Sequence, residues 1–253
     1  MGRAFFIFTF FGLIFGRKGF KFNICNKNKP KYNTTMQARI LLFLALFSLS
    51  SLSFSQNEKG EKFLKTMKTY YITHPKDIVN QTIDIINGGL WDEGYFEMRF
   101  KAFYSVLFTV NPAVKAEFQK KVSKIKSSEF SDLFEQLFNT TVEDVYANAP
   151  ETPDVNEMLC YSYYANGDTK YLDQLLEKAK DNEERVDLMK FMIGANALWW
   201  LANTRDEDIL IQQYLETLPN NNYAVIALKS RAYDLKNQQL VVLEYQKKKK
   251  IWK

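Results

Sequence analysis

Apolar residues recur at the spacing of an α-helix through most of the chain, and this periodicity limits the fold more than any other feature. Phe96, Phe100, Phe103 and Leu107, for example, follow one another at intervals of four, three and four residues. Such intervals place side chains on one face of a helix, where they can be buried together. No segment of any length after residue 55 alternates apolar and polar residues as a half-buried strand would. The sequence therefore predicts an all-α protein.

Turn residues divide these periodic segments into about eleven short helices with short connections, which favours antiparallel helix pairs. Predicted helix starts near Glu58, Glu93 and Ser128 are about 35 residues apart, a spacing typical of helical repeats. We therefore expect stacked antiparallel helical hairpins, an α-solenoid-like or tetratricopeptide-like array. Residues 150–153, which include two prolines, mark the clearest break, either a subdomain seam or a longer loop.

Local signals set several helix ends. Capping-box spacing, in which a hydroxyl and a carboxylate three residues apart satisfy helix N–H groups, occurs at Thr140 with Glu143 and at Thr204 with Glu207. The segment Val186 to Leu201 is apolar almost all round, which predicts a helix in the middle of the fold. For Leu240 to Leu243 a helix and a short β-like end both remain open.

The segment from Met36 to Gln56 has the features of a secretory signal peptide. Arg39 precedes the apolar stretch Ile40 to Phe47, and Ser53 and Ser55 supply small residues at the −3 and −1 positions. We therefore interpret residues 36–55 as a signal peptide cleaved near Ser55, and residues 56–253 as one all-helical domain that is periplasmic or secreted. Residues 1–35 are interpreted as a start assigned too far upstream or a disordered extension; a membrane-interacting N-terminus is the alternative.

Charge and cysteine content narrow the function further. Residues 1–55 carry eight of the 34 basic residues and none of the 29 acidic ones, so the remainder has a net charge of −3. An acidic body gives no electrostatic reason to expect nucleic acid as a partner. Cys25 lies before the predicted cleavage site, so Cys160 has no partner for a disulfide and the fold must depend on its core.

Three segments resemble uncharacterised, exported helical proteins of the Bacteroidetes type. YSYYANGDTKYLDQLLEKA, from Tyr161 to Ala179, is similar to their helix–GD–helix pattern, and GANALWWLANTRDEDI, from Gly194 to Ile209, to the helix that follows. TVNPAVKAEF, from Thr109 to Phe118, resembles an earlier helix junction, and the leader is similar to theirs. The resemblance implies a helical, repeat-like fold and no known activity, so it assigns no functional residues.

The residues that could perform chemistry have structural explanations. His74 is the only histidine and stands before Pro75, where a position at a helix start is expected. One histidine and one cysteine cannot form a zinc site without several carboxylates. The acidic clusters lie at predicted helix starts, where the helix dipole favours negative charge: Asp92-Glu93, Glu143-Asp144, Glu183-Glu184 and Asp206 to Asp208. We therefore predict no catalytic, cofactor-binding or metal-binding residues.

Aromatic residues are the candidates for a binding surface. Trp199 and Trp200, with Tyr161 and Tyr164, could line a groove for a peptide or sugar, although such residues more often pack in a core. The two tryptophans are neighbours on a predicted helix and project about 100° apart, so one of them is expected to reach the surface.

These features lead to three hypotheses about function. The first is a non-enzymatic protein-interaction module of the cell envelope, without cofactors, which binds a protein or peptide and meets the membrane only through its signal segment. The second is a carboxylate-based hydrolase that acts on a glycan or another envelope substrate. The third is a membrane-associated protein anchored by an uncleaved N-terminus.

Overall fold

The computed structural model describes residues 58–89, 93–249 and 251, and every regular element among them is a helix. The absence of strands from these residues confirms the all-α prediction. The chain divides into Met1–Ser50 and Ser51–Lys253, and all described residues belong to the second unit. The predicted extension (1–35) and the signal segment (36–55) lie outside the described residues. Within the described ranges, no helix is both long enough and apolar enough to cross a membrane.

The helices before the proline break start close to the predicted positions. A helix over residues 58–68 comes first, and later helices begin at Glu93 and Ser128. The further elements are α2 (Tyr70–Thr73), α3 (Ile78–Asn87), α4 (Glu93–Val110), α5 (Pro112–Lys121), the 3₁₀ turn η2 (Val122–Lys124), α6 (Ser128–Leu137) and α7 (Val142–Ala147).

The cap of α7 differs from the prediction by one residue. The Thr141 hydroxyl accepts a hydrogen bond from the backbone N–H of Asp144 at 3.1 Å, and the Asp144 carboxylate accepts one from the N–H of Thr141 at 3.2 Å. The predicted pair Thr140 and Glu143 is therefore wrong. Thr140 instead donates its hydroxyl to the carbonyl of Gln136, because it still belongs to the turn that ends α6.

After the proline break, one helix is longer than predicted. The elements after the break are α8 (Asp154–Asn166), α9 (Lys170–Ala179), the 3₁₀ turn η3 (Lys180–Glu183), α10 (Leu188–Glu207), α11 (Ile209–Glu216), α12 (Asn222–Lys229) and α13 (Ala232–Lys249). The capping box predicted at Thr204 and Glu207 is wrong, because α10 continues through both residues and Asp208 caps α11. Leu240 to Leu243 belong to α13, so this segment is helical and does not form the β-like end that the sequence left open.

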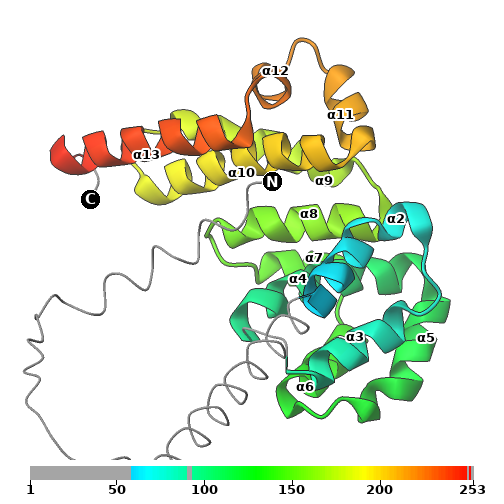
Figure 1. Cartoon of the computed structure of the whole chain (residues 1–253). Helices are drawn as coiled ribbons and strands as arrows, with labels where there is room; N and C mark the ends of the chain where they lie inside the picture. Colours follow the sequence, from blue (N-terminus) through cyan, green and yellow to red (C-terminus); the bar gives the residue numbers. More distant parts are fainter. Residues whose placement is uncertain (1–57, 90–92, 250, 252–253) are drawn as a thin grey trace, which may run out of the picture. The chain divides into compact units, whose positions relative to one another are not determined.

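The core is built around α4 and α8, which share the most extensive contact between any two helices of the described chain. Figure 1 shows α8 between α4 on one side and α10 on the other, and both neighbours contact it. The predicted stripe Phe96, Phe100, Phe103 and Leu107 is buried, as expected. Rings from other helices close on it: Phe118 and Phe134 stack with centroids 4.2 Å apart. Each such aromatic pair adds about 0.5–1.5 kcal/mol beyond area burial.

One ion pair lies inside this core. Arg99 on α4 donates from Nε and Nη2 to Oε1 of Glu157 on α8, at 2.8 and 2.5 Å. The guanidinium also lies over the rings of Phe96 and Tyr161, with 5.1 and 5.2 Å to the centroids. The pair therefore joins the two central helices, and removal of one partner would leave a buried charge.

Candidate functional site

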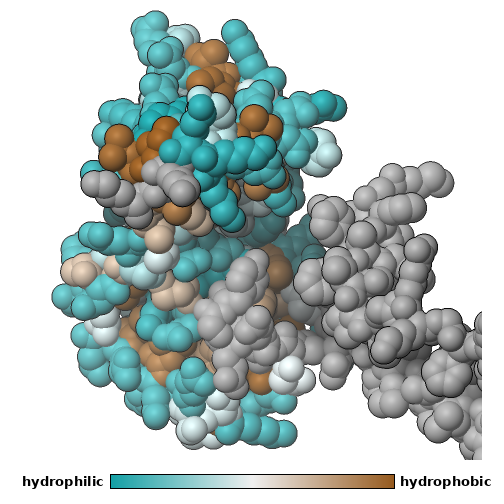
Figure 2. All heavy atoms as spheres, turned by 90° about the vertical axis from the view of Figure 1, so that its left-hand side faces the viewer, coloured by the Kyte–Doolittle hydropathy of each residue, from teal (hydrophilic) through white to brown (hydrophobic). Residues whose placement is uncertain are grey.

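A groove of about 410 Å³ lies between α10 and α13 and is the best candidate for a binding site. Pro153, from the loop before α8, lies at one edge of it. Figure 2 shows brown, hydrophobic side chains among teal ones on the upper part of the face that it presents, the level at which α10 and α13 lie in Figure 1. The groove is lined by Pro153, Phe191, Met192, Ala195, Asn196, Trp199, Lys236, Gln239, Leu240 and Leu243.

The α10 wall results from a helix that is apolar almost all round. One side of α10, with Phe191, Ala195 and Leu198, is buried. The adjacent face carries Met192 and Trp199, which remain partly accessible. Because α10 has more apolar surface than its neighbours cover, part of that surface is left for the groove.

The α13 wall has a more regular pattern. Lys236, Leu240, Leu243 and Lys247 follow at intervals of four, three and four residues and therefore share one helix face. Leu240 remains 48% exposed although it lines the groove. The wall thus has a lysine at one end and two leucines beyond it, and Lys247 continues the same face of α13 outside the groove.

Hydrogen bonds to α10 hold the base of the groove. Gln239 donates from Nε2 to the carbonyl of Ala195 at 2.7 Å, which ties α13 to α10. Asn156 of α8 donates from Nδ2 to the carbonyl of Ile193 and to Oδ1 of Asn196, at 2.8 and 3.0 Å. The groove therefore has a fixed floor.

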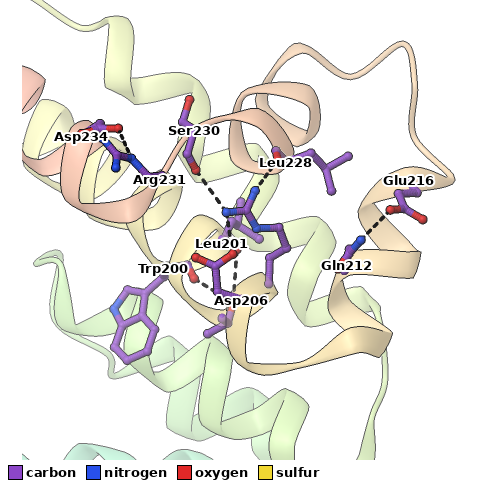
Figure 3. Close-up of polar contacts among 11 residues, drawn as sticks. Trp200, Leu201, Asp206, Gln212, Glu216, Leu228, Ser230, Arg231 and Asp234 are labelled. Carbon is purple, nitrogen blue, oxygen red and sulfur yellow. Dashed lines mark hydrogen bonds and ion pairs between the residues drawn. The ribbon is translucent and has the colours of Figure 1, made fainter. Parts of the chain in front are cut away.

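The position of α13 also depends on Arg205, near the end of α10. Its guanidinium donates to the carbonyl of Leu228 and, at 3.3 Å, to that of Ser230, on the connection from α12 to α13. It also pairs with Asp206 at 2.7 Å. Figure 3 shows dashed contacts from Leu228, Ser230 and Asp206 to one guanidinium group that lies between them. These contacts fix the point at which α13 begins.

The predicted aromatic residues separate into two groups. Trp199 lines the groove, and Trp200 is partly buried against the core, with its ring centroid 5.2 Å from that of Trp199. The expectation that Tyr161 and Tyr164 share such a surface is wrong, because they are only 1% and 2% exposed. Both lie on α8, which α4, α9 and α10 cover. Burial raises the pKa of both phenols above their ordinary value.

His74 and Cys160 lie in different environments, the first exposed at the end of α2 and the second buried in α8. His74 is an exposed capping residue, as expected, but it caps the end of α2 in the left-handed conformation, with φ of 42°, and does not begin a helix. Cys160 is buried in α8, and burial raises the pKa of its thiol. No group of three or more histidine, cysteine or acidic side chains within the described residues could hold a metal ion.

The acidic clusters follow the dipole explanation only in part. Glu143 and Asp144 lie in the first turn of α7, as predicted. Glu183 instead ends η3, and Asp206 lies in the last turn of α10. Glu157 is the one carboxylate of the described residues that is buried, and it pairs with Arg99.

Sequence reasoning missed Met192, Lys236, Leu240 and Leu243, which with Trp199 make half of the groove lining. The intervals of four, three and four residues on α13 were a signal that could have indicated one helix face. That signal does not reveal which helix lies opposite, since this depends on the connection through Arg205.

Comparison with known proteins adds no relative to this description. Neither protein-family models, nor curated proteins, nor solved structures give a match to the chain.

Proposed function

We propose that the protein is a non-enzymatic binding module of the cell envelope, and that the α10–α13 groove takes an apolar segment of a partner protein. The observation that supports this most directly is the open apolar groove with Trp199, Met192, Leu240 and Leu243 along its walls. Apolar grooves between two helices are suited to helical or extended segments of other proteins.

The arrangement of the second half supports a stack of helical hairpins. Consecutive helices contact one another, α8 with α9 and α9 with α10, and α13 returns to contact α10. In helical arrays, such stacking leaves elongated surfaces along which partner segments bind. We therefore include a repeat-like helical array in the proposal, together with the resemblance to exported Bacteroidetes-type proteins.

The location in the envelope rests on the predicted signal segment. Arg39, the apolar stretch that follows it and the small residues before Gln56 are the features that an export pathway requires. N-terminal sequencing of natively produced protein tests this location. Gln56 as the first residue is the expected result, and a chain that retains residues 1–55 would contradict it.

Two substitutions test the groove. Leu240 and Val241 are both exposed on α13, at 48% and 67%, but only Leu240 lines the groove. We expect L240D to abolish capture of envelope proteins by the full-length chain, whereas V241D should retain it. Circular dichroism would show whether both variants keep the helical fold. Equal capture by both variants, or no specific partner for the wild type, would contradict the proposal.

A further inference from the structure

The charges around the groove specify its occupant more closely, provided that the groove is the binding site proposed above. Lys236 is the one charged residue among those that line it. Lys247 lies on the same face of α13, beyond Leu243. Within the described residues, no ion pair joins either lysine to a carboxylate, so both charges remain available to an occupant.

We infer that the occupant is an amphipathic helix of a partner protein, with two carboxylates about three turns apart on one edge. Lys236 and Lys247 are 11 residues apart, which corresponds to about 16 Å along a helix. A helix packed alongside α13 would place residues i and i+11 at the same separation. Its apolar face would cover Leu240 and Leu243 on one wall and Met192 and Trp199 on the other.

A helix fits this site better than an extended segment for a geometric reason. The lining residues of α10 extend from Phe191 to Trp199, and those of α13 from Lys236 to Leu243. Each span is two turns of helix, or about 10–12 Å. Two adjacent helices with unfilled apolar faces form two sides of a three-helix arrangement, in which a third helix packs its side chains into the shared groove.

Acidic side chains near the groove favour an acidic edge beside α13, while Arg185, whose guanidinium lies 5.6 Å from the ring centroid of Phe191, adds one positive charge on the α10 side. Glu151 and Asp154 flank Pro153, which lines the groove, and both are exposed. Glu244 follows Leu243 on α13 but lies off the stripe that carries the two lysines. Carboxylates on every side of the occupant would be repelled by these acidic side chains. Charge complementarity therefore requires the carboxylates of the occupant to lie on one edge only.

Three synthetic peptides test the inference with the full-length chain. Each is an 18-residue amphipathic helix with leucines on one face, and they differ only at positions i and i+11, which are both Glu, both Gln or both Lys. Fluorescence anisotropy of the labelled peptides measures affinity. Two exposed charge pairs should make the Glu peptide bind about three- to tenfold more tightly than the Gln peptide, and the Lys peptide should bind least. At about 1 M salt, where the screening length is about 3 Å, this advantage should disappear.

Variants separate this inference from the proposed function. K236Q/K247Q should remove the preference for Glu, whereas K229Q/K248Q, which changes the net charge equally, should keep it. If all three peptides bind alike and L240D abolishes binding, the groove is a binding site but the acidic helix is wrong. If none binds, both ideas fail. Lysine-dependent binding to phosphatidylglycerol vesicles without peptide binding, or a dimer that L240D dissociates, would also overturn the inference.

Discussion

Gly194 is the residue at which the smallest substitution should have the largest structural effect. It lies in α10 opposite the backbone of η3. A Cβ at this position would be 2.8 Å from Cα of Asp181, and closer still to the Asp181 carbonyl carbon and to N of Asn182. Non-bonded carbon atoms prefer about 3.5–4.0 Å. Because the nearest of these atoms, N of Asn182, would be 2.1 Å away, the added methyl group would require η3 to move by about 1.5 Å.

The expected free energy follows from two opposing effects in G194A. Alanine is favoured over glycine in a helix by about 1 kcal/mol. Forced overpacking costs about 1–3 kcal/mol and more where, as here, the obstructing atoms belong to the backbone. We therefore expect a net loss of about 2 kcal/mol in the free energy of unfolding. For a domain of this size, the melting temperature should fall by about 4–8 °C.

Gly60 provides the matched control. It also lies in a helix, over residues 58–68, but a Cβ there would have nothing within 4 Å. G60A should therefore stabilise the protein by about 0.5–1 kcal/mol. Urea unfolding and thermal melting followed by circular dichroism measure both variants. If G194A is as stable as the wild type or more stable, the argument from the close approach of η3 is refuted.

Three further predictions concern caps, the core ion pair and alkaline pH. T141A should lose about 1 kcal/mol of stability in urea unfolding, because it removes the cap of α7, whereas T140A should change little; a larger loss for T140A would restore the rejected cap. E157A should lose about 3 kcal/mol, while loss of the exposed carboxylate in E97A should cost less than about 0.5 kcal/mol; equal effects would contradict the importance of burial. Burial raises the pKa of Tyr104 in the folded state above its unfolded value of about 10. The free energy of unfolding is therefore unaffected by this group below about pH 10 and falls above it, because the unfolded chain loses the proton first. Y104F should reduce this fall by up to about 1.4 kcal/mol per pH unit, and an unchanged slope in unfolding measured from pH 9 to 12 would refute the effect.

The parts of the fold that local sequence determines were predicted well. The stripe from Phe96 to Leu107 is periodic over several turns, so its helix and its buried face follow from spacing alone. The start of α5 also follows from local signals, because Asn111 caps the helix and Pro112 fits its first turn. These signals act over a few residues and do not depend on distant parts of the chain.

Helix ends were less predictable where two signals competed. Thr140 and Thr141 both have an acid three residues later, and only the end of α6 decides which of them caps α7. Thr204 and Glu207 have the spacing of a cap but lie inside α10. There Asp208 ends one helix and begins the next, so three acids in a row gave an ambiguous boundary.

The candidate site could be predicted only in part because it depends on tertiary packing. The argument that one of two adjacent tryptophans reaches a surface agrees with the position of Trp199 in the groove. For Tyr161 and Tyr164, composition could not show that α8 is covered on several sides. The remaining residues of the groove come from α13, and their relation to α10 is a long-range contact that no local pattern contains.

The contacts of Arg205 have a consequence for how the sequence can change. Its guanidinium binds main-chain carbonyls of Leu228 and Ser230 rather than their side chains. Any residue supplies the same carbonyl, so the connector at Ser230 can exchange its side chain in evolution while the arginine preserves the path of the chain, whereas the side chain of Leu228 also packs against the core. Variation among related chains should therefore concentrate in the connector and spare Arg205.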